Sequence, residues 1–246
     1  MFNIMKLLKC FIDNGERDVI SHGKLFVIES GTDGSGKATQ TQMLYEALVA
    51  EGHKVIKITF PDYESDSSAL VKMYLKGDFG SNPDDVNPYI ASEFYAVDRY
   101  ASFKTYWEKY YNEGYIILAD RYTTSNMVHQ GVKMKGRAKN KYLNWLYDLE
   151  YVKNKIPVPT AVLLLNLPPE VSQKLMAERL NKFTGDKEKD IHESNVEYLK
   201  KCYDNALGIA KKYKWTNISC AENGDIKDKE VIHNDVLMQV KKFLQQ

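Results

Sequence analysis

The sequence predicts an α/β protein of three layers, in which a five-stranded parallel sheet is flanked by helices on both faces. Short β-rich runs alternate with longer helical patterns along the 246 residues, an order typical of right-handed crossovers between parallel strands. The runs LFVI, YIIL and AVLLL are apolar at consecutive positions, as expected of strands that are buried on both faces. No repeat or low-complexity segment interrupts the alternation.

The individual elements follow from this alternation. The expected strands cover 25–29, 54–60, 115–120, 160–166 and 215–219. The helical patterns cover about 37–50, 66–76, 87–113, 122–153, 169–181, 192–213 and 226–245. In such sheets the ligand binds beyond the carboxyl ends of the strands. The residues that follow each strand are therefore the first candidates for a functional site.

Composition excludes some classes of partner. The formal net charge is +1, from 34 basic and 33 acidic residues, so no global charge draws the protein to nucleic acid or a membrane surface. The longest apolar run outside the N-terminal segment, AVLLLNL, is far shorter than the roughly 20 residues of a membrane span. We expect neither partner.

The N-terminal segment and the cysteines give no sign of export. Residues 1–23 carry lysines within their apolar part and have no small-residue cleavage pattern, so they are interpreted as an extra helix or a loose arm. Cys10, Cys202 and Cys220 are far apart and lack metal-ligand spacing. Reduced thiols in a cytoplasmic protein are the expectation.

A glycine-rich turn follows the first strand. Gly31, Gly36 and Lys37 satisfy the pattern Gly-x-x-x-x-Gly-Lys between a buried strand and a helix start. Such a turn directs backbone N–H groups and a helix N-terminus at an anion, and the lysine reaches the outer phosphates. The predicted phosphate-binding residues are Gly31, Thr32, Asp33, Gly34, Ser35, Gly36, Lys37, Ala38 and Thr39.

Ala38 is the irregular position of this loop. A serine or threonine hydroxyl usually stands there and holds Mg²⁺, and alanine cannot replace it. Thr39 follows, but its side chain points about 100° away along a helix. Three interpretations stay open at this point: a metal held by waters and a distant aspartate, weakened metal binding, or a degenerate protein.

Two further clusters carry suitable chemistry. Asp120 and Arg121 follow the third strand, where a carboxylate suits a water-mediated Mg²⁺ contact and a guanidinium fits a phosphate. Tyr95 and Arg99 are four residues apart in an expected helix and therefore share one face. An aromatic plane beside a guanidinium suits a planar base with polar edges.

Four motifs occur together in a characteristic order. They are DGSGK after the first strand, FP after the second, FYAVDRY in the helix over 87–113 and DRYTTSN after the third strand. In order and spacing they resemble the thymidylate kinase family of P-loop nucleoside monophosphate kinases. DRYTTSN is the most specific, because the loop alone indicates only the P-loop superfamily. The resemblance implies a kinase-like domain over 24–246, preceded by the extension 1–23.

This resemblance implies a P-loop NTPase fold and the reaction ATP + dTMP → ADP + dTDP with Mg²⁺. It also implies a homodimer that pairs through helices, and the aromatic helix over 87–113 is compatible with that.

The resemblance also assigns residues to an acceptor site. It implies that Asp33 binds the 3′-hydroxyl of the sugar, Tyr95 stacks on thymine and Arg99 contacts the base edge. Arg121 would bind the acceptor phosphate, and Ser125 would lie beside the base with its neighbouring asparagine. The whole predicted acceptor site is Asp33, Phe60, Tyr95, Arg99, Arg121, Ser125, Asn126, His129 and Gln130.

A catalytic lid is a further implication. Members of the family place a catalytic arginine either in the loop or in a lid, and this loop has Gly34 at the variable position. The lid is expected over about 178–193, with Arg179 as the candidate cation. A solvated loop between helices explains the same charges. The predicted catalytic residues are Asp33, Lys37, Arg121 and Arg179.

Three departures from the family pattern leave alternatives. Ser30 stands where a glutamate is common, Tyr63 replaces an arginine of some members, and His129 replaces an aromatic that guards against a 2′-hydroxyl. The acceptor could therefore be dUMP, UMP or dGMP in place of dTMP. A nucleotide-binding relative without catalysis is the alternative from another class.

Overall fold

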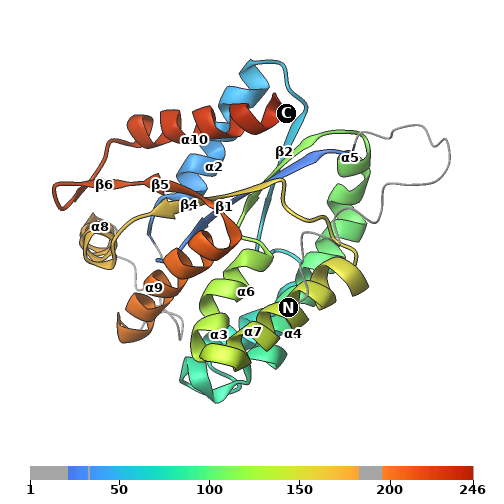
Figure 1. Cartoon of the computed structure of the whole chain (residues 1–246), viewed down its shortest axis with the longest axis vertical. Coiled ribbons are helices and arrows are strands. Elements are labelled where there is room, and N and C mark those ends of the chain that lie inside the picture. The colour runs from blue at the N-terminus through green and yellow to red at the C-terminus, as the bar shows by residue number, and fades with distance from the viewer. Residues whose placement is uncertain (1–21, 33, 183–195, 246) are drawn as a thin grey trace.

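The computed structural model describes residues 22–32, 34–182 and 196–245. Within them, a parallel sheet of five strands has the order β2-β3-β1-β4-β5 (Figure 1). The strands are β1 (Lys24–Ser30), β2 (Val55–Thr59), β3 (Ile116–Asp120), β4 (Ala161–Asn166) and β5 (Thr216–Ser219). Each lies within one residue of its predicted bounds at both ends, and the predicted α/β class is confirmed.

Helices cover both faces of this sheet, because successive strand residues point to opposite sides. Phe26 and Ile28 of β1 pack with one cluster, whereas Leu25 and Val27 pack with another. The first face is covered by α2 (Lys37–Ala50) and α10 (Lys229–Leu244). The second is covered by the π-helix Phe103–Trp107, which follows α4 (Pro88–Ser102), and by α6 (Thr123–His129) and α9 (Val196–Tyr213) (Figure 1). Further α-helices of the described residues are α3 (Ala69–Lys76), α5 (Glu108–Asn112), α7 (Gly136–Tyr147) and α8 (Pro169–Lys182).

The predicted single helix over 122–153 is wrong. The chain forms α6, a 3-10 turn at Gly131–Lys133, α7 and a π-helix at Asp148–Lys153. Extended backbone at Met134 and Lys135 and a positive φ of 53° at Gly136 separate α6 from α7. The helix expected over 87–113 is continuous, but it contains a second π-helix, Phe103–Trp107, between α4 and α5.

A small hairpin was also missed before the last helix. The helix expected to begin near 226 begins at Lys229, after β6 (Ala221–Glu222) and β7 (Asp225–Ile226). Asn223 and Gly224 connect these strands with φ values of 52° and 86°. Two consecutive positive φ angles in an Asn-Gly pair are typical of the type I′ turn that matches strand twist.

Two predicted segments lie outside the described residues. They are residues 1–21 of the N-terminal extension and residues 183–193 of the expected lid. In the part of the chain that is described, no helix combines the length and apolarity of a membrane span.

The turn after β1 lies directly against α9. A Cβ atom on Gly31 would stand 2.7 Å from Cα of Tyr203 and 3.0 Å from Cβ of Ala206. Backbone atoms cannot move aside as a flexible side chain can. Gly31 therefore sets how closely the phosphate-loop region approaches this helix.

We predict that Gly31→Ala lowers the free energy of unfolding by about 1–3 kcal/mol, the usual range for overpacking. Urea denaturation would measure it. Gly208→Ala is the matched control, because Gly208 also lies in α9 but has no atom within 4 Å of an added Cβ. That control should be neutral or stabilise by about 1 kcal/mol, the helix-propensity difference. Equal effects of the two substitutions would contradict the packing argument.

Candidate active site

The glycine-rich turn holds the amine of Lys37 in a nest of oxygen atoms. Nζ of Lys37 donates to Oγ of Ser30 at 2.7 Å, to the carbonyl oxygen of Thr32 at 3.3 Å and to Oγ of Ser35 at 3.5 Å. Gly34 and Gly36 have φ values of 69° and 84°, which glycine adopts without steric cost. This geometry places the Lys37 amine where it could bind an anion at the N-terminus of α2.

The other predicted loop residues fall into two groups. Thr32 and Ser35 are buried, whereas Ala38 and Thr39 are exposed on the first turn of α2. Asp33, predicted to be both catalytic and substrate-binding, lies outside the described residues. The structure therefore places the loop and its lysine but says nothing of the aspartate.

Asp120 ends β3 next to the phosphate loop. It pairs in register with Ile28 of β1 and Thr59 of β2. Its Oδ1 atom is buried and accepts no hydrogen bond. A buried carboxylate oxygen without a donor suits a hydrated cation, and Mg²⁺ keeps several waters when one or two carboxylates and substrate phosphates hold it. The residue predicted as a metal contact therefore fits that group.

A cavity opens beside this edge of the sheet. It encloses about 580 Å³ of empty space when the solvent at its open mouth is included. Apart from Asp33, every residue predicted for the acceptor site lines it, together with four residues that were not predicted for that site. The lining residues are Phe60, Pro61, Tyr63, Leu75, Tyr95, Arg99, Arg121, Tyr122, Ser125, Asn126, His129 and Gln130.

Arg121 has a left-handed backbone, with φ of 67°. Such a conformation is uncommon for a residue with a side chain and often marks functional sites. Its N–H donates to the carbonyl oxygen of Ile28 at 3.2 Å, which continues the β1–β3 pairing by one residue. Its Nη1 lies 3.4 Å from Nε2 of His129. The guanidinium and the imidazole thus stand together at one side of the cavity.

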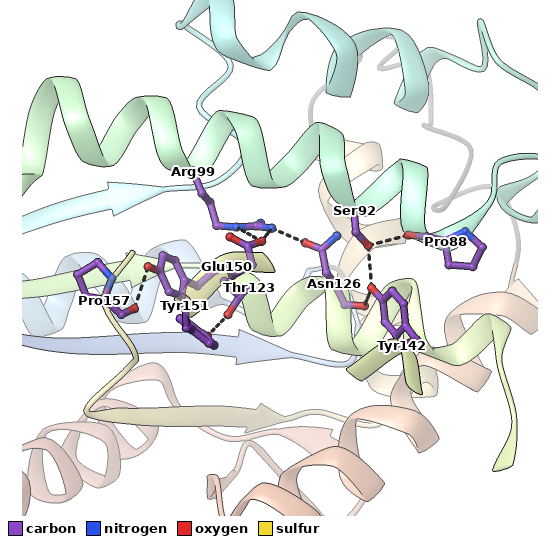
Figure 2. A network of polar contacts seen from close by, with 10 residues as sticks. Pro88, Ser92, Arg99, Thr123, Asn126, Tyr142, Glu150, Tyr151 and Pro157 are labelled. Carbon is purple, nitrogen blue, oxygen red and sulfur yellow. Dashed lines mark hydrogen bonds and ion pairs between the residues drawn. The ribbon is translucent and has the colours of Figure 1, made fainter. Parts of the chain in front are cut away.

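The floor of the cavity contains a buried ion pair that the sequence did not indicate. Arg99 is 1% exposed and contacts Glu150, which is fully buried, through Nε at 3.0 Å and also through Nη2 (Figure 2). Nη2 also donates to Oδ1 of Asn126 at 2.9 Å. Glu150 raises the pKa of Arg99, which burial alone would lower. Because Glu150 lies 51 residues from Arg99 and in the segment expected to be one long helix, no local pattern identified it.

Glu29 is a second carboxylate that positions the site. It is fully buried, and its oxygen atoms accept from the Ser30 N–H at 3.0 Å, Thr124 Oγ1 at 2.8 Å and Ser125 Oγ at 2.7 Å. The last two residues lie in α6. The carboxylate therefore ties β1, which leads into the phosphate loop, to the helix that follows Arg121.

Lys133 supports the part of the cavity lining that contains Gln130. Its Nζ donates to the hydroxyl of Tyr74 at 3.2 Å and contacts the carbonyl oxygen of Pro83. The same hydroxyl accepts from Nε2 of Gln130 at 3.3 Å. Burial lowers the pKa of Lys133 to about 8. These contacts fix Gln130 at the edge of the cavity.

The lid arginine is only partly placed. Arg179 lies in α8, but its side chain is outside the described part of the structure. The structure therefore does not bring this residue to the site or remove it from the site.

Comparisons with known proteins bear on this combination of loop and cavity. The sequence model of the thymidylate kinase family matches residues 28–234. The chain belongs to the thymidylate kinase family. The match includes the phosphate loop, Asp120 and every residue that lines the cavity.

Relatives in the thymidylate kinase family come from distant organisms. A probable thymidylate kinase of Thermococcus onnurineus is 28% identical over 219 residues, which cover 88% of this chain and 97% of the relative. The thymidylate kinase of Mycobacterium tuberculosis is 27% identical over 175 residues, covering 70% and 79%. The solved structure of the Candida albicans thymidylate kinase superposes with a TM-score of 0.64 at 20% identity, over 90% of this chain and 92% of that one. This structural likeness supports the P-loop NTPase fold.

Proposed function

We propose that this protein transfers the γ-phosphoryl group of ATP to dTMP and so forms dTDP. The observation that carries the proposal is the shared edge of two adjacent strands. Lys37 and its loop follow β1, and Arg121 with the lined cavity follows β3. An outer-phosphate site and an acceptor-phosphate site on neighbouring strands can hold two nucleotides end to end. Membership of the thymidylate kinase family supports dTMP as the acceptor.

On the donor side, the phosphates of ATP bind the loop. Backbone N–H groups of the turn and the N-terminus of α2 offer partial positive charge, and Lys37 exchanges its oxygen contacts for the outer phosphates. Before the nucleotide binds, the Ser30 hydroxyl accepts a hydrogen bond from the Lys37 amine and keeps it beside the loop. We also assign a role to Arg179, as a lid cation that approaches the transferred group from 178–193.

On the acceptor side, different residues of the cavity contact different parts of dTMP. Arg121 binds the phosphate of dTMP, and Tyr95 stacks on the ring against Phe60 across the cavity. Arg99 and Asn126 meet the base edge from the floor, and Ser125 and Gln130 lie beside it. His129 and Asp33 belong to the sugar and phosphate end.

Mg²⁺ is a proposed cofactor. Asp120 would hold it through water, because its buried Oδ1 has no other donor and Ala38 offers no hydroxyl. When bound, such an ion neutralises charge on the β- and γ-phosphate oxygens.

The protein itself needs no nucleophile. An oxygen of the acceptor phosphate attacks the γ-phosphorus, and the bond to the β–γ bridging oxygen of ATP breaks, so ADP leaves. Lys37 and Arg121 align the two phosphates and offset their repulsion. Water exclusion by a closed lid would limit hydrolysis of ATP.

The first test is turnover with a panel of acceptors. ADP release should be fastest with dTMP, and dUMP, UMP and dGMP should react more slowly. Lys37→Ala should lower kcat by about 10³-fold, as removal of a phosphate-neutralising cation does, while Lys211→Ala, an exposed lysine of α9, should not. Preference for another acceptor would replace dTMP in the proposal. Tight nucleotide binding by calorimetry without any turnover would mean a non-catalytic relative.

A second test concerns Ala38. If metal is held by water and Asp120 alone, Ala38→Ser supplies the missing ligand and should lower the Mg²⁺ concentration for half-maximal turnover several-fold. Asp120→Asn should raise it by at least tenfold, since it removes the charge that holds the hydrated ion. A Mg²⁺ titration with ATP held constant measures both. An unchanged requirement in Asp120→Asn would remove that residue from the metal site.

We further propose that two copies pair through α4 and α3, and that the protein is cytoplasmic. Exposed apolar side chains on these neighbouring helices support the pairing: Ile90, Val97 and Tyr100 on α4, with Leu70 and Met73 on α3. Surface apolar groups of this kind mark association sites when they gather in one patch. The buried free thiols of Cys202 and Cys220 agree with a reducing compartment.

Sedimentation equilibrium tests the pairing. The protein should sediment as a dimer of 28.3 kDa chains, and Val97→Glu should convert it to a monomer, because a charge would be buried without a partner. Val231→Glu is the matched control, because Val231 is 50% exposed on α10, away from the patch. A monomeric wild-type protein, or dissociation by both variants alike, would count against this interface.

A further inference from the structure

The ion pair beneath the cavity is unusual in its burial. Arg99 is 1% exposed and Glu150 is fully buried, so neither charge is solvated. A guanidinium remains protonated in proteins, and a buried charge needs a counter-charge. Glu150 is therefore ionised beside Arg99, and together they place no net charge under the cavity.

The pair also determines which atoms face the ligand. Nε and Nη2 of Arg99 are engaged by Glu150, and Nη2 also donates to Asn126. Nη1 is therefore the nitrogen of the guanidinium that is left for a ligand in the cavity. Arginine has no acceptor, so the group of Asn126 that faces it must be the oxygen. The amide nitrogen of Asn126 then points elsewhere, and it is buried without a hydrogen-bond partner.

Gln130 adds an acceptor to these donors. Its Nε2 donates to Tyr74, and its Oε1 is buried without a partner. The floor and edge of the cavity thus combine N–H donors at Arg99 and Asn126 with an oxygen at Gln130. A neutral pyrimidine-2,4-dione carries the matching set, two carbonyl oxygens on either side of one ring N–H.

The backbone near Glu150 is built to bring the carboxylate inward. The residue lies in the π-helix Asp148–Lys153, and its carbonyl oxygen accepts from the Ile156 N–H at 3.2 Å. Tyr151, the next residue, contacts the hydroxyl of Thr123 in α6. Single π-helical turns are rare and concentrate at functional sites. The local irregularity therefore serves the placement of one side chain.

We propose that Glu150 is a positioning residue that determines base specificity: by neutralising Arg99 and orienting Asn126, it makes the cavity select a neutral pyrimidine-2,4-dione over an ionised one. This inference rests on the proposed function. Without the Glu150 charge, the guanidinium would be uncompensated and would attract an anionic ring. Glu150 does not touch the reacting phosphates and is not a catalytic residue.

The probe is 5-nitro-dUMP, whose nitro group acidifies the ring N–H so that the ring ionises near neutral pH. Its affinity relative to dTMP is measured by calorimetry from pH 6 to 9. The ratio cancels titrations that affect both ligands alike, including that of Lys133, whose pKa burial lowers to about 8. Tyr122, Tyr142 and Tyr151 surround the pair, and burial raises their pKa values, so they stay neutral in this range. Arg121 stays charged.

In wild-type protein the relative affinity should fall about tenfold per pH unit above the ring pKa, because only the neutral form binds. Glu150→Gln keeps an oxygen for Arg99 but removes the charge, and it should shift the preference at least tenfold toward the ionised ring. Arg99→Met in the same chain should restore the wild-type preference. Glu197→Gln, an exposed glutamate of α9, is the matched control and should change nothing.

A Glu150→Gln protein that binds with the wild-type preference would overturn the inference. If that variant fails to fold, the pH dependence of the wild-type protein tests the inference. A relative affinity for 5-nitro-dUMP that stays constant or rises with pH would mean that the cavity accepts the ionised ring, and it would overturn the inference. Turnover of dTMP by the wild-type protein tests the proposed function separately. An active kinase with an unchanged preference in Glu150→Gln would overturn only the role of Glu150.

Discussion

The parallel pairing of β1 with β3 is the constraint on which the rest of the site depends. In this register Ile28 stands beside Asp120, and the Arg121 N–H continues the ladder to Ile28. The glycine-rich loop follows β1 and the Arg121 turn follows β3, so both begin at the same edge of the sheet. Glu29 then bonds hydroxyls of α6 across the gap. Backbone hydrogen bonds and one buried carboxylate thus hold the phosphate loop beside the cavity.

The buried ion pair of Arg99 and Glu150 is not an efficient way to stabilise the fold. Removing one partner of a buried ion pair typically costs about 3–5 kcal/mol, whereas an apolar pair of equal volume can be as stable. The pair is therefore poorly explained by stability alone. It makes sense where a fixed guanidinium must offer N–H groups to a ligand without offering net charge. The left-handed backbone of Arg121, which lines the same cavity, is a second energetically unfavourable feature of the kind that persists at functional sites.

Much of this architecture could be predicted from the sequence, and the failures have physical causes. Strands β1, β3 and β4 were identified because each is a short run of consecutive apolar residues, and each is buried on both faces. The cavity residues followed from the family resemblance, which rests on motifs after β2 and β3 and in α4. Glu150 was missed because a counter-ion in a distant segment leaves no periodic signal, and its π-helix was hidden inside a helical pattern. The hairpin at Asn223 was missed although the Asn-Gly pair is a turn signal, because the strands are only two residues long.

The close approach of Gly31 to α9 has a consequence for the distance between the phosphate loop and the cavity. Tyr203 of α9 touches the start of the phosphate loop, while Tyr198 of the same helix donates to the carbonyl oxygen of His129 beside the cavity. Five residues of helix separate these contacts, about 7.5 Å at 1.5 Å per residue. One helix, α9, therefore sets the distance between the phosphate loop and the cavity. This distance depends on the register of the helix, which can change only in steps of one residue.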